Sequence, residues 1–182
     1  GCVLATADAG GGYVYSKIIS VSFDSKKDNW VSEPLDTLCL KLYGGESGIL
    51  VIGDTKYAYY NSKGEMQKEY EYPAKLIDWD YQNGKTALLF QNETKRLSYI
   101  TTVDSENKEP NYSEFENNNA KCIRIIDGHV CVLGKDGITQ YNFKGGSEKK
   151  ISSEGSYEEM IYIDDYIFLL GYDRIDRIDY KS

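Results

Sequence analysis

Paired acidic residues are the first candidates for chemistry in this 182-residue chain. Asp78 and Asp80 could imitate the two carboxyl groups of a glycosidase, which lie about 5 to 10 Å apart across a cleft. Asp164 and Asp165 form a second pair. Side chains alternate along a strand, so Asp78 and Asp80 would share one face while Trp79 points to the other. Among 29 acidic residues such neighbours arise by chance, and we predict no catalytic residue.

Other catalytic and ligand-binding motifs are incomplete. His129 is the only histidine, so a Ser-His-Asp or Cys-His mechanism would need it, yet it follows Gly128 at a predicted hairpin turn. The run Gly10-Gly11-Gly12 lacks the Lys-Ser/Thr pair that completes a phosphate loop, so it indicates a hairpin connection. We therefore predict a surface turn position for His129 and no bound cofactor.

The cysteines lie far apart and form no CxxC motif, which argues against a zinc site. We predict no metal site and interpret all four as small core residues: Cys2, Cys39, Cys122 and Cys131. If Asp127-Gly128 forms a two-residue hairpin turn, Cys131 faces Arg124 and Cys122 faces Leu133. The two cysteines are then diagonal neighbours about 7 to 8 Å apart, beyond easy disulfide reach.

The 17 tyrosines are the most unusual feature of the composition, and they crowd around Trp79. Tyrosine offers a large contact area with a polar tip, which suits a binding surface for a protein or a sugar. It equally suits packing between sheets, and packing is the favoured interpretation of the set. The residues that we select as a possible binding surface are Tyr57, Tyr59, Tyr72, Trp79 and Tyr81.

Charge and hydropathy exclude two classes of partner for the chain as given. A net charge of -8 and a pI near 4.8 disfavour nucleic acid, which is bound through clustered Lys and Arg. No stretch approaches the roughly 20 apolar residues of a membrane span. Gly1 stands without an initiator Met and resembles a scar of tag removal, so we expect upstream sequence with room for a signal or an anchor.

A short signature recurs about every forty residues, a period typical of propeller blades. It consists of an apolar or aromatic residue, then Asp or Asn, then any residue, and usually Lys. The copies are Phe23–Lys26, Tyr60–Lys63, Val103–Glu106, Tyr141–Lys144 and Ile178–Lys181. The Asp or Asn is of the type that bonds its own backbone two residues on, so each signature predicts a turn.

Apolar runs precede each signature and indicate strands that are covered on both faces, as in stacked sheets. We predict an all-β fold, a β-propeller or partial propeller of about five repeats of roughly 40 residues, with four antiparallel strands per blade. The repeats of this single domain, 1–182, are approximately 2–34, 36–72, 74–117, 119–153 and 156–182. Residues 106–119 are polar and contain Pro110, which predicts an extended loop.

The segment Ile19–Trp30 resembles the quinoprotein-type propeller repeat, in which a strand ends in Asp, a turn follows, and a Trp packs between blades. The metal and quinone ligands of cofactor-using quinoproteins have no counterpart here, so no catalytic role is transferred. The pattern from Gly12 to Trp30 also resembles a bacterial membrane-anchored β-propeller-like family of unknown function. That resemblance implies an extracytoplasmic location and an anchor in upstream sequence.

These observations favour a non-catalytic extracytoplasmic binding or scaffold module, whose partner is a protein or a cell-wall component. The alternatives are a carbohydrate-active enzyme with paired carboxylates and a cofactor-binding quinoprotein-like propeller. The repeat register leaves the first and last blades one strand short each. We therefore expect a fragment of a longer propeller, which forms an open arc or associates edge to edge with another copy.

Overall fold

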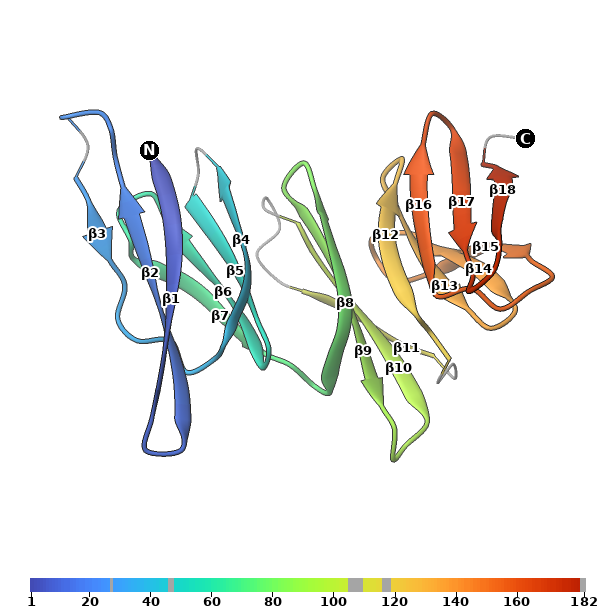
Figure 1. Cartoon of the computed structure of the whole chain (residues 1–182), viewed down its shortest axis with the longest axis horizontal. Coiled ribbons are helices and arrows are strands. Elements are labelled where there is room, and N and C mark those ends of the chain that lie inside the picture. The colour runs from blue at the N-terminus through green and yellow to red at the C-terminus, as the bar shows by residue number, and fades with distance from the viewer. Residues whose placement is uncertain (27, 46–47, 105–109, 116–118, 181–182) are drawn as a thin grey trace. The chain divides into compact units, whose positions relative to one another are not determined.

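The computed structural model describes residues 1–26, 28–45, 48–104, 110–115 and 119–180, and all of its regular elements are antiparallel strands (Figure 1). Within these ranges there is no helix that is long and apolar enough to cross a membrane. The chain divides into two compact units, Gly1–Pro73 and Ala74–Ser182, which are described separately. The predicted all-β class is confirmed.

The N-terminal unit holds two sheets, one of three strands and one of four. The three-stranded sheet has the order β1 (Cys2–Gly10), β2 (Tyr13–Val21), β3 (Trp30–Val31). The four-stranded sheet has the order β4 (Cys39–Gly45), β5 (Gly48–Gly53), β6 (Lys56–Asn61), β7 (Met66–Glu71). Each sheet falls within one predicted repeat.

The C-terminal unit holds three sheets, of which the last has three strands. The first is β8 (Lys75–Gln82), β9 (Lys85–Asn92), β10 (Leu97–Asp104), β11 (Asn111–Phe115). The second is β12 (Cys122–Ile126), β13 (His129–Gly134), β14 (Gly137–Tyr141), β15 (Ser147–Ser152). The third is β16 (Glu159–Ile163), β17 (Tyr166–Leu170), β18 (Ile175–Asp179).

Two-residue hairpin turns set the register between the first and second strands of the sheets in the C-terminal unit. Asp127 and Gly128 both have positive φ, 48° and 78°, as a type I′ turn requires. Ile126 therefore pairs with His129, Arg124 with Cys131 and Cys122 with Leu133, which confirms the predicted register.

The repeated signature forms the predicted turn in the copies where the structure describes it. The Asn61 side-chain oxygen accepts hydrogen bonds from the backbone N–H of Lys63 and of Glu65, at 2.9 and 3.0 Å. Asn142 makes the same pair of bonds to Lys144 and Gly146, at 2.9 and 3.0 Å. The copies at 103–106 and 178–181 each include residues outside the described ranges. An Asx turn is therefore the structural role of the signature.

Apolar side chains pack between neighbouring sheets within each unit. In the N-terminal unit Ile18 of the first sheet belongs to one cluster with Ile49, Val51, Ala58 and Tyr60 of the second. In the C-terminal unit two further clusters lie on the two faces of the sheet β12–β15. The first contains Leu89, Ile123 and Val130, and the second contains Leu133, Met160 and Ile167. The uninterrupted apolar run of β13 is thus covered on both faces, as predicted.

The prediction of an extended loop over residues 106–119 is wrong for its central part. Asn111–Phe115 form β11, which pairs with β10 from Ser98 to Thr102. Aromatic packing stabilises this strand although its sequence is polar. The ring centroids of Tyr112 and Tyr99 are 5.5 Å apart, and those of Phe115 and Tyr141 are 5.6 Å apart. Residues 106–109 and 116–118 lie outside the described ranges.

The prediction that all four cysteines are core residues holds for two of them. Cys122 and Cys131 are buried, whereas Cys2 is exposed and Cys39 is half-buried; all four are free thiols. Cys2 is the first residue of β1, at the end of its sheet, and this position explains why its side chain is exposed. Burial raises the pKa of Cys131 to about 12 and raises the pKa of Cys122 still further.

We expect alkylation by a maleimide at pH 8 to modify Cys2 first, because the thiolate is the reactive form and Cys2 is accessible. Cys122 and Cys131 should react only after denaturation, since burial raises both pKa values and blocks access. Peptide mapping under denaturing, non-reducing conditions should find all four thiols free. A disulfide-linked peptide that contains Cys122 and Cys131 would contradict the register argument.

Trp30 packs between the two sheets of the N-terminal unit. Its ring stacks on Tyr60 of β6 with centroids 6.0 Å apart, and a Cβ added at Gly64 would lie 2.5 Å from its Cδ2 atom. Gly64 lies three residues after Asn61, in the same turn, and has a φ of 82°. Packing of a Trp between neighbouring sheets is therefore confirmed, while the quinoprotein type of the repeat stays a prediction.

We expect Gly64→Ala to destabilise the chain by about 2 kcal/mol more than Gly11→Ala, measured by urea unfolding. Both glycines have positive φ, so both variants carry the strain of a Cβ in the left-handed region. Only at Gly64 does the new methyl group meet a ring, whereas Gly11 has open space around it. Equal losses of stability in Gly64→Ala and Gly11→Ala would contradict the close packing of Trp30 against Gly64.

Candidate functional site

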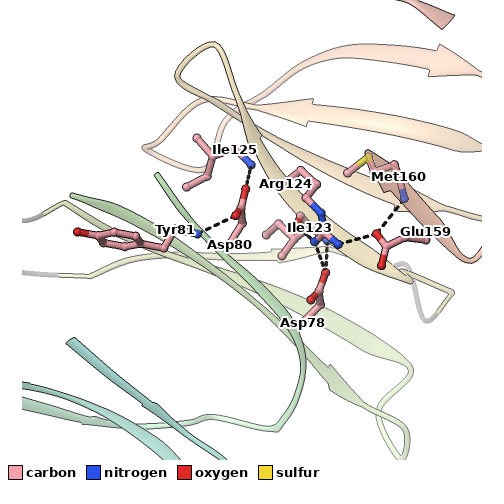
Figure 2. Close-up of polar contacts among 8 residues, drawn as sticks. All are labelled: Asp78, Asp80, Tyr81, Ile123, Arg124, Ile125, Glu159 and Met160. Atoms are coloured by element: carbon pink, nitrogen blue, oxygen red, sulfur yellow. Dashed lines mark hydrogen bonds and ion pairs between the residues drawn. The ribbon is translucent and has the colours of Figure 1, made fainter. Parts of the chain in front are cut away.

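The paired acids of the sequence analysis, Asp78 and Asp80, lie on the same face of β8 and point at β12 (Figure 2). The Asp78 carboxylate accepts the backbone N–H of Ile123 at 2.9 Å. The Asp80 carboxylate accepts the backbone N–H of Ile125 at 2.7 Å and that of its neighbour Tyr81 at 2.8 Å. Two acids spaced by two residues thus bond two amides spaced by two residues on the next sheet.

Arg124 extends this contact to a third sheet (Figure 2). Its Nη1 atom donates to Asp78 at 2.6 Å, and its Nη2 atom donates to Glu159 of β16 at 2.5 Å. The same Glu159 oxygen accepts the backbone N–H of Met160 at 2.9 Å. Burial lowers the pKa of Arg124, but the two carboxylates outweigh it and raise the pKa overall. One guanidinium therefore links the first strands of three sheets.

The bonding pattern assigns Asp78 and Asp80 a structural role. A glycosidase needs one carboxyl group that donates a proton and one that attacks or activates water, both facing a cleft. Here the Asp78 carboxylate accepts hydrogen bonds from a backbone amide and from the Arg124 guanidinium, and the Asp80 carboxylate accepts hydrogen bonds from two backbone amides. The amides of Ile123 and Ile125 belong to the edge of β12 that does not pair with β13, so the acids satisfy groups that would otherwise lack a strand partner.

The five aromatic residues selected from the sequence are only partly accessible. Tyr57 is buried and packs on Tyr70 with ring centroids 5.5 Å apart. Tyr59, Tyr72, Trp79 and Tyr81 are half-buried. The first three of the five selected residues belong to the N-terminal unit and the last two to the C-terminal unit. Neither unit assembles the set by itself, and its role as a binding surface stays a prediction.

His129 lies at the predicted hairpin turn. Its Nδ1 atom is 3.1 Å from the Asp127 carbonyl oxygen, and its Nε2 atom is 3.3 Å from a Glu148 carboxylate oxygen. The side chain is half-exposed, and no nucleophile is among these contacts. In the described part of the chain, no three His, Cys, Asp or Glu side chains are grouped as a metal would require.

A polar cluster that the sequence analysis missed lies beside the last sheet. Arg174, in the connection between β17 and β18, donates to Asp176 at 2.7 Å, to the Tyr157 hydroxyl and to the Glu154 carbonyl. The Tyr157 hydroxyl donates in turn to Asp176. The Arg174 guanidinium also lies over the Tyr157 ring, 5.1 Å from its centroid. The connections 153–158 and 171–174 are thereby tied together.

Two surface depressions adjoin this cluster, with volumes of about 360 and 400 Å³. The residues that line the smaller one are Gly155, Ser156, Glu158, Tyr172, Asp173 and Arg174. Tyr172 is fully exposed. The sequence signal for this site is the run Tyr172-Asp173-Arg174, which follows the apolar strand β17. The run does not predict that the Tyr172 ring is exposed.

We expect Asp78→Ala to lower the free energy of unfolding by about 2 to 3 kcal/mol, because it leaves an amide and a guanidinium without their acceptor. Asp80→Ala should cost about 1 to 2 kcal/mol, since it removes only amide contacts. Asp136→Ala, at an exposed turn, is the matched control and should be nearly neutral. Urea unfolding measures all three, and neutral effects at 78 and 80 would refute the structural role.

Solved structures similar to this chain share its fold at low sequence identity. The Neurospora crassa Pan2 WD40 domain matches with a TM-score of 0.53 and 8% identity, over 93% of this chain and 59% of that one. Kluyveromyces lactis Hsv2p matches with a TM-score of 0.63 and 13% identity, over 92% and 58% respectively. A protein of unknown function from Bacteroides caccae matches with 0.52 and 16%, over 97% and 73%.

These similarities establish the sheets as blades of a propeller-like fold and carry no function. The chain spans a little over half the length of the Pan2 and Hsv2p chains that it matches. No curated protein matches the sequence. The model of a family of unknown function, DUF5711, matches residues 2–179, and the chain therefore belongs to that family.

Proposed function

We propose that this chain is a non-catalytic, extracytoplasmic binding module whose partner is a protein with an exposed basic segment. The exposed Tyr172 and its fixed polar neighbours beside the last sheet carry the proposal. The extracytoplasmic location rests on the sequence resemblance alone, and the binding surface does not depend on it.

Tyrosine and arginine, together with tryptophan, are the side chains that contribute most often to the energy of protein interfaces. The whole ring of Tyr172 is accessible to a partner. Tyr172 lines the smaller depression and Arg174 lines both, and each depression is large enough for one or two partner side chains. Arg174 is held by Asp176 and Tyr157, so its position is set before a partner arrives. Preorganisation of this kind lowers the entropy cost of binding.

The charges around Tyr172 favour a basic partner. Asp173 and Glu154 are exposed, and Arg174 contacts Glu154 at its backbone carbonyl rather than at its carboxylate. The charge of Arg174 itself is neutralised by Asp176. A Lys or Arg side chain of the partner could lie over the Tyr172 ring and pair with these acids. The net charge of -8 would also steer a basic segment toward the chain.

The role of Asp78 and Asp80 supports this proposal over a carbohydrate-active enzyme. Their carboxylates hold backbone amides of β12 and the guanidinium of Arg124. No group of three His, Cys, Asp or Glu side chains among the described residues favours a metal-assisted form of the cofactor-binding alternative.

We expect a fluorescently labelled Lys- and Arg-rich peptide to bind the chain at low salt, and Tyr172→Ala to weaken that binding about tenfold. Tyr13→Ala is the matched control, because Tyr13 is an exposed tyrosine at the β1–β2 hairpin. Fluorescence polarisation measures both, and a Glu-rich peptide should not bind.

Equal affinity of the two variants would contradict the proposed surface. A glycan array provides the second arm of the experiment. Binding to cell-wall glycans that depends on Tyr172, without peptide binding, would replace the protein partner by a cell-wall component.

A further inference from the structure

One acid in the wall of the smaller depression already binds a cation of the same chain. Glu158 lines this depression together with Tyr172. The Lys121 Nζ atom lies 2.9 Å from the Glu158 Oε2 atom. Lys121 stands outside the set of residues that line the depression, so its side chain approaches the carboxylate from the outside. The chain's own lysine therefore shows that an ammonium group fits beside this carboxylate.

Backbone hydrogen bonds fix Lys121 and Glu158 at the starts of two sheets of the C-terminal unit. The Lys121 N–H donates to the Leu133 carbonyl at 2.8 Å, directly before β12. The Glu158 N–H donates to the Leu170 carbonyl at 2.9 Å, directly before β16. The two side chains remain accessible, because that of Lys121 is 42% exposed and that of Glu158 is 62% exposed. The backbones are thus anchored, whereas the charged groups face solvent.

An ion pair with this exposure contributes little to stability and is screened by salt. A cation of a partner can therefore take the place of Lys121 at Glu158 while the fold is kept. Such an exchange breaks one ion pair for each ion pair that it forms. The net attraction of Glu158 for a partner is consequently smaller than that of an acid without a cation of its own chain beside it.

The charges around the depression show in which direction Lys121 acts. The lining contains two acids, Glu158 and Asp173, and one base, Arg174. Asp176 balances the charge of Arg174, and Lys121 balances the charge of Glu158. If the charge of Lys121 were removed, both acids of the lining would attract a basic segment.

We propose that Lys121 is an internal competitor, which lowers the affinity of this depression for a basic partner. A Lys or Arg side chain of the partner displaces Lys121 and pairs with Glu158. This inference rests on the proposed function, because it concerns the same surface and the same class of partner. It adds that the charge at position 121 sets the affinity of the surface.

Fluorescence polarisation with the labelled Lys- and Arg-rich peptide, on the full chain at low salt, tests the competitor role. Lys121→Met removes the charge and keeps a long side chain, and it should bind the peptide about threefold more tightly than the parent. Lys144→Met is the matched control and should leave the affinity nearly unchanged. It removes one positive charge at an exposed turn beyond the opposite end of the same sheet.

A second pair of variants tests whether Lys121 acts through Glu158. Glu158→Gln should weaken peptide binding about threefold, because it removes the acid that the partner's cation would take. Lys121→Met should then bring no further gain in the Glu158→Gln background, since the two charges act as a pair. The gain of Lys121→Met alone should shrink as the salt concentration rises. Circular dichroism verifies that each variant is folded.

The outcomes separate this inference from the proposed function. Equal affinity of Lys121→Met and the parent, with binding that still depends on Tyr172, would overturn the competitor role and leave the proposed function in place. An equal gain in Lys144→Met would also overturn it, because net charge alone would then explain the effect. So would a gain that persists in the Glu158→Gln background. Absence of peptide binding by the parent and by every variant would instead contradict the proposed function, and the competitor role with it.

Discussion

A sheet with apolar side chains on both faces must be covered on both faces, and this constraint governs the rest of the structure. The second strands of the middle repeats are apolar without interruption, so no arrangement with one wet face is open to them. Stacking of successive sheets solves the problem with short connections. The position of Trp30 and the burial of Tyr60 and Tyr141 are consequences, since these rings fill space between two stacked sheets.

Stacking buries the faces of a sheet, but it provides no hydrogen-bond partners for the backbone of the edge strands. Asp78 and Asp80 of β8 provide such partners for β12. The free amides of β12 cannot reach the backbone of another sheet, because stacked sheets meet through side chains. Asp78 and Asp80 provide acceptors in place of a strand, and Arg124 carries the contact on to β16. A pair of carboxylates that would suggest catalysis in isolation is therefore part of the framework.

The sequence was sufficient for features that depend on neighbours along the chain. The register of Cys122 and Cys131 followed from the Asp127-Gly128 turn, and the Asx turns followed from Asn61 and Asn142. Features that depend on contacts between repeats could not be derived. The bonds of Asp78 and Asp80 join residues 45 positions apart, and β11 is stabilised by rings on other strands. No local pattern records which side chain will meet which amide across two stacked sheets.

The same division explains why function is the hardest property to derive for this fold. The apolar runs and turn residues that build the stack recur with the repeat, whereas Tyr172 and Arg174 lie outside that pattern, in the connection between β17 and β18. A residue in a connection outside the repeat pattern need not be apolar to cover a sheet face. Its residue type can therefore be selected for contact with a partner. Departures from the repeat, rather than the repeat itself, are therefore where specificity in a stack of similar sheets should be sought.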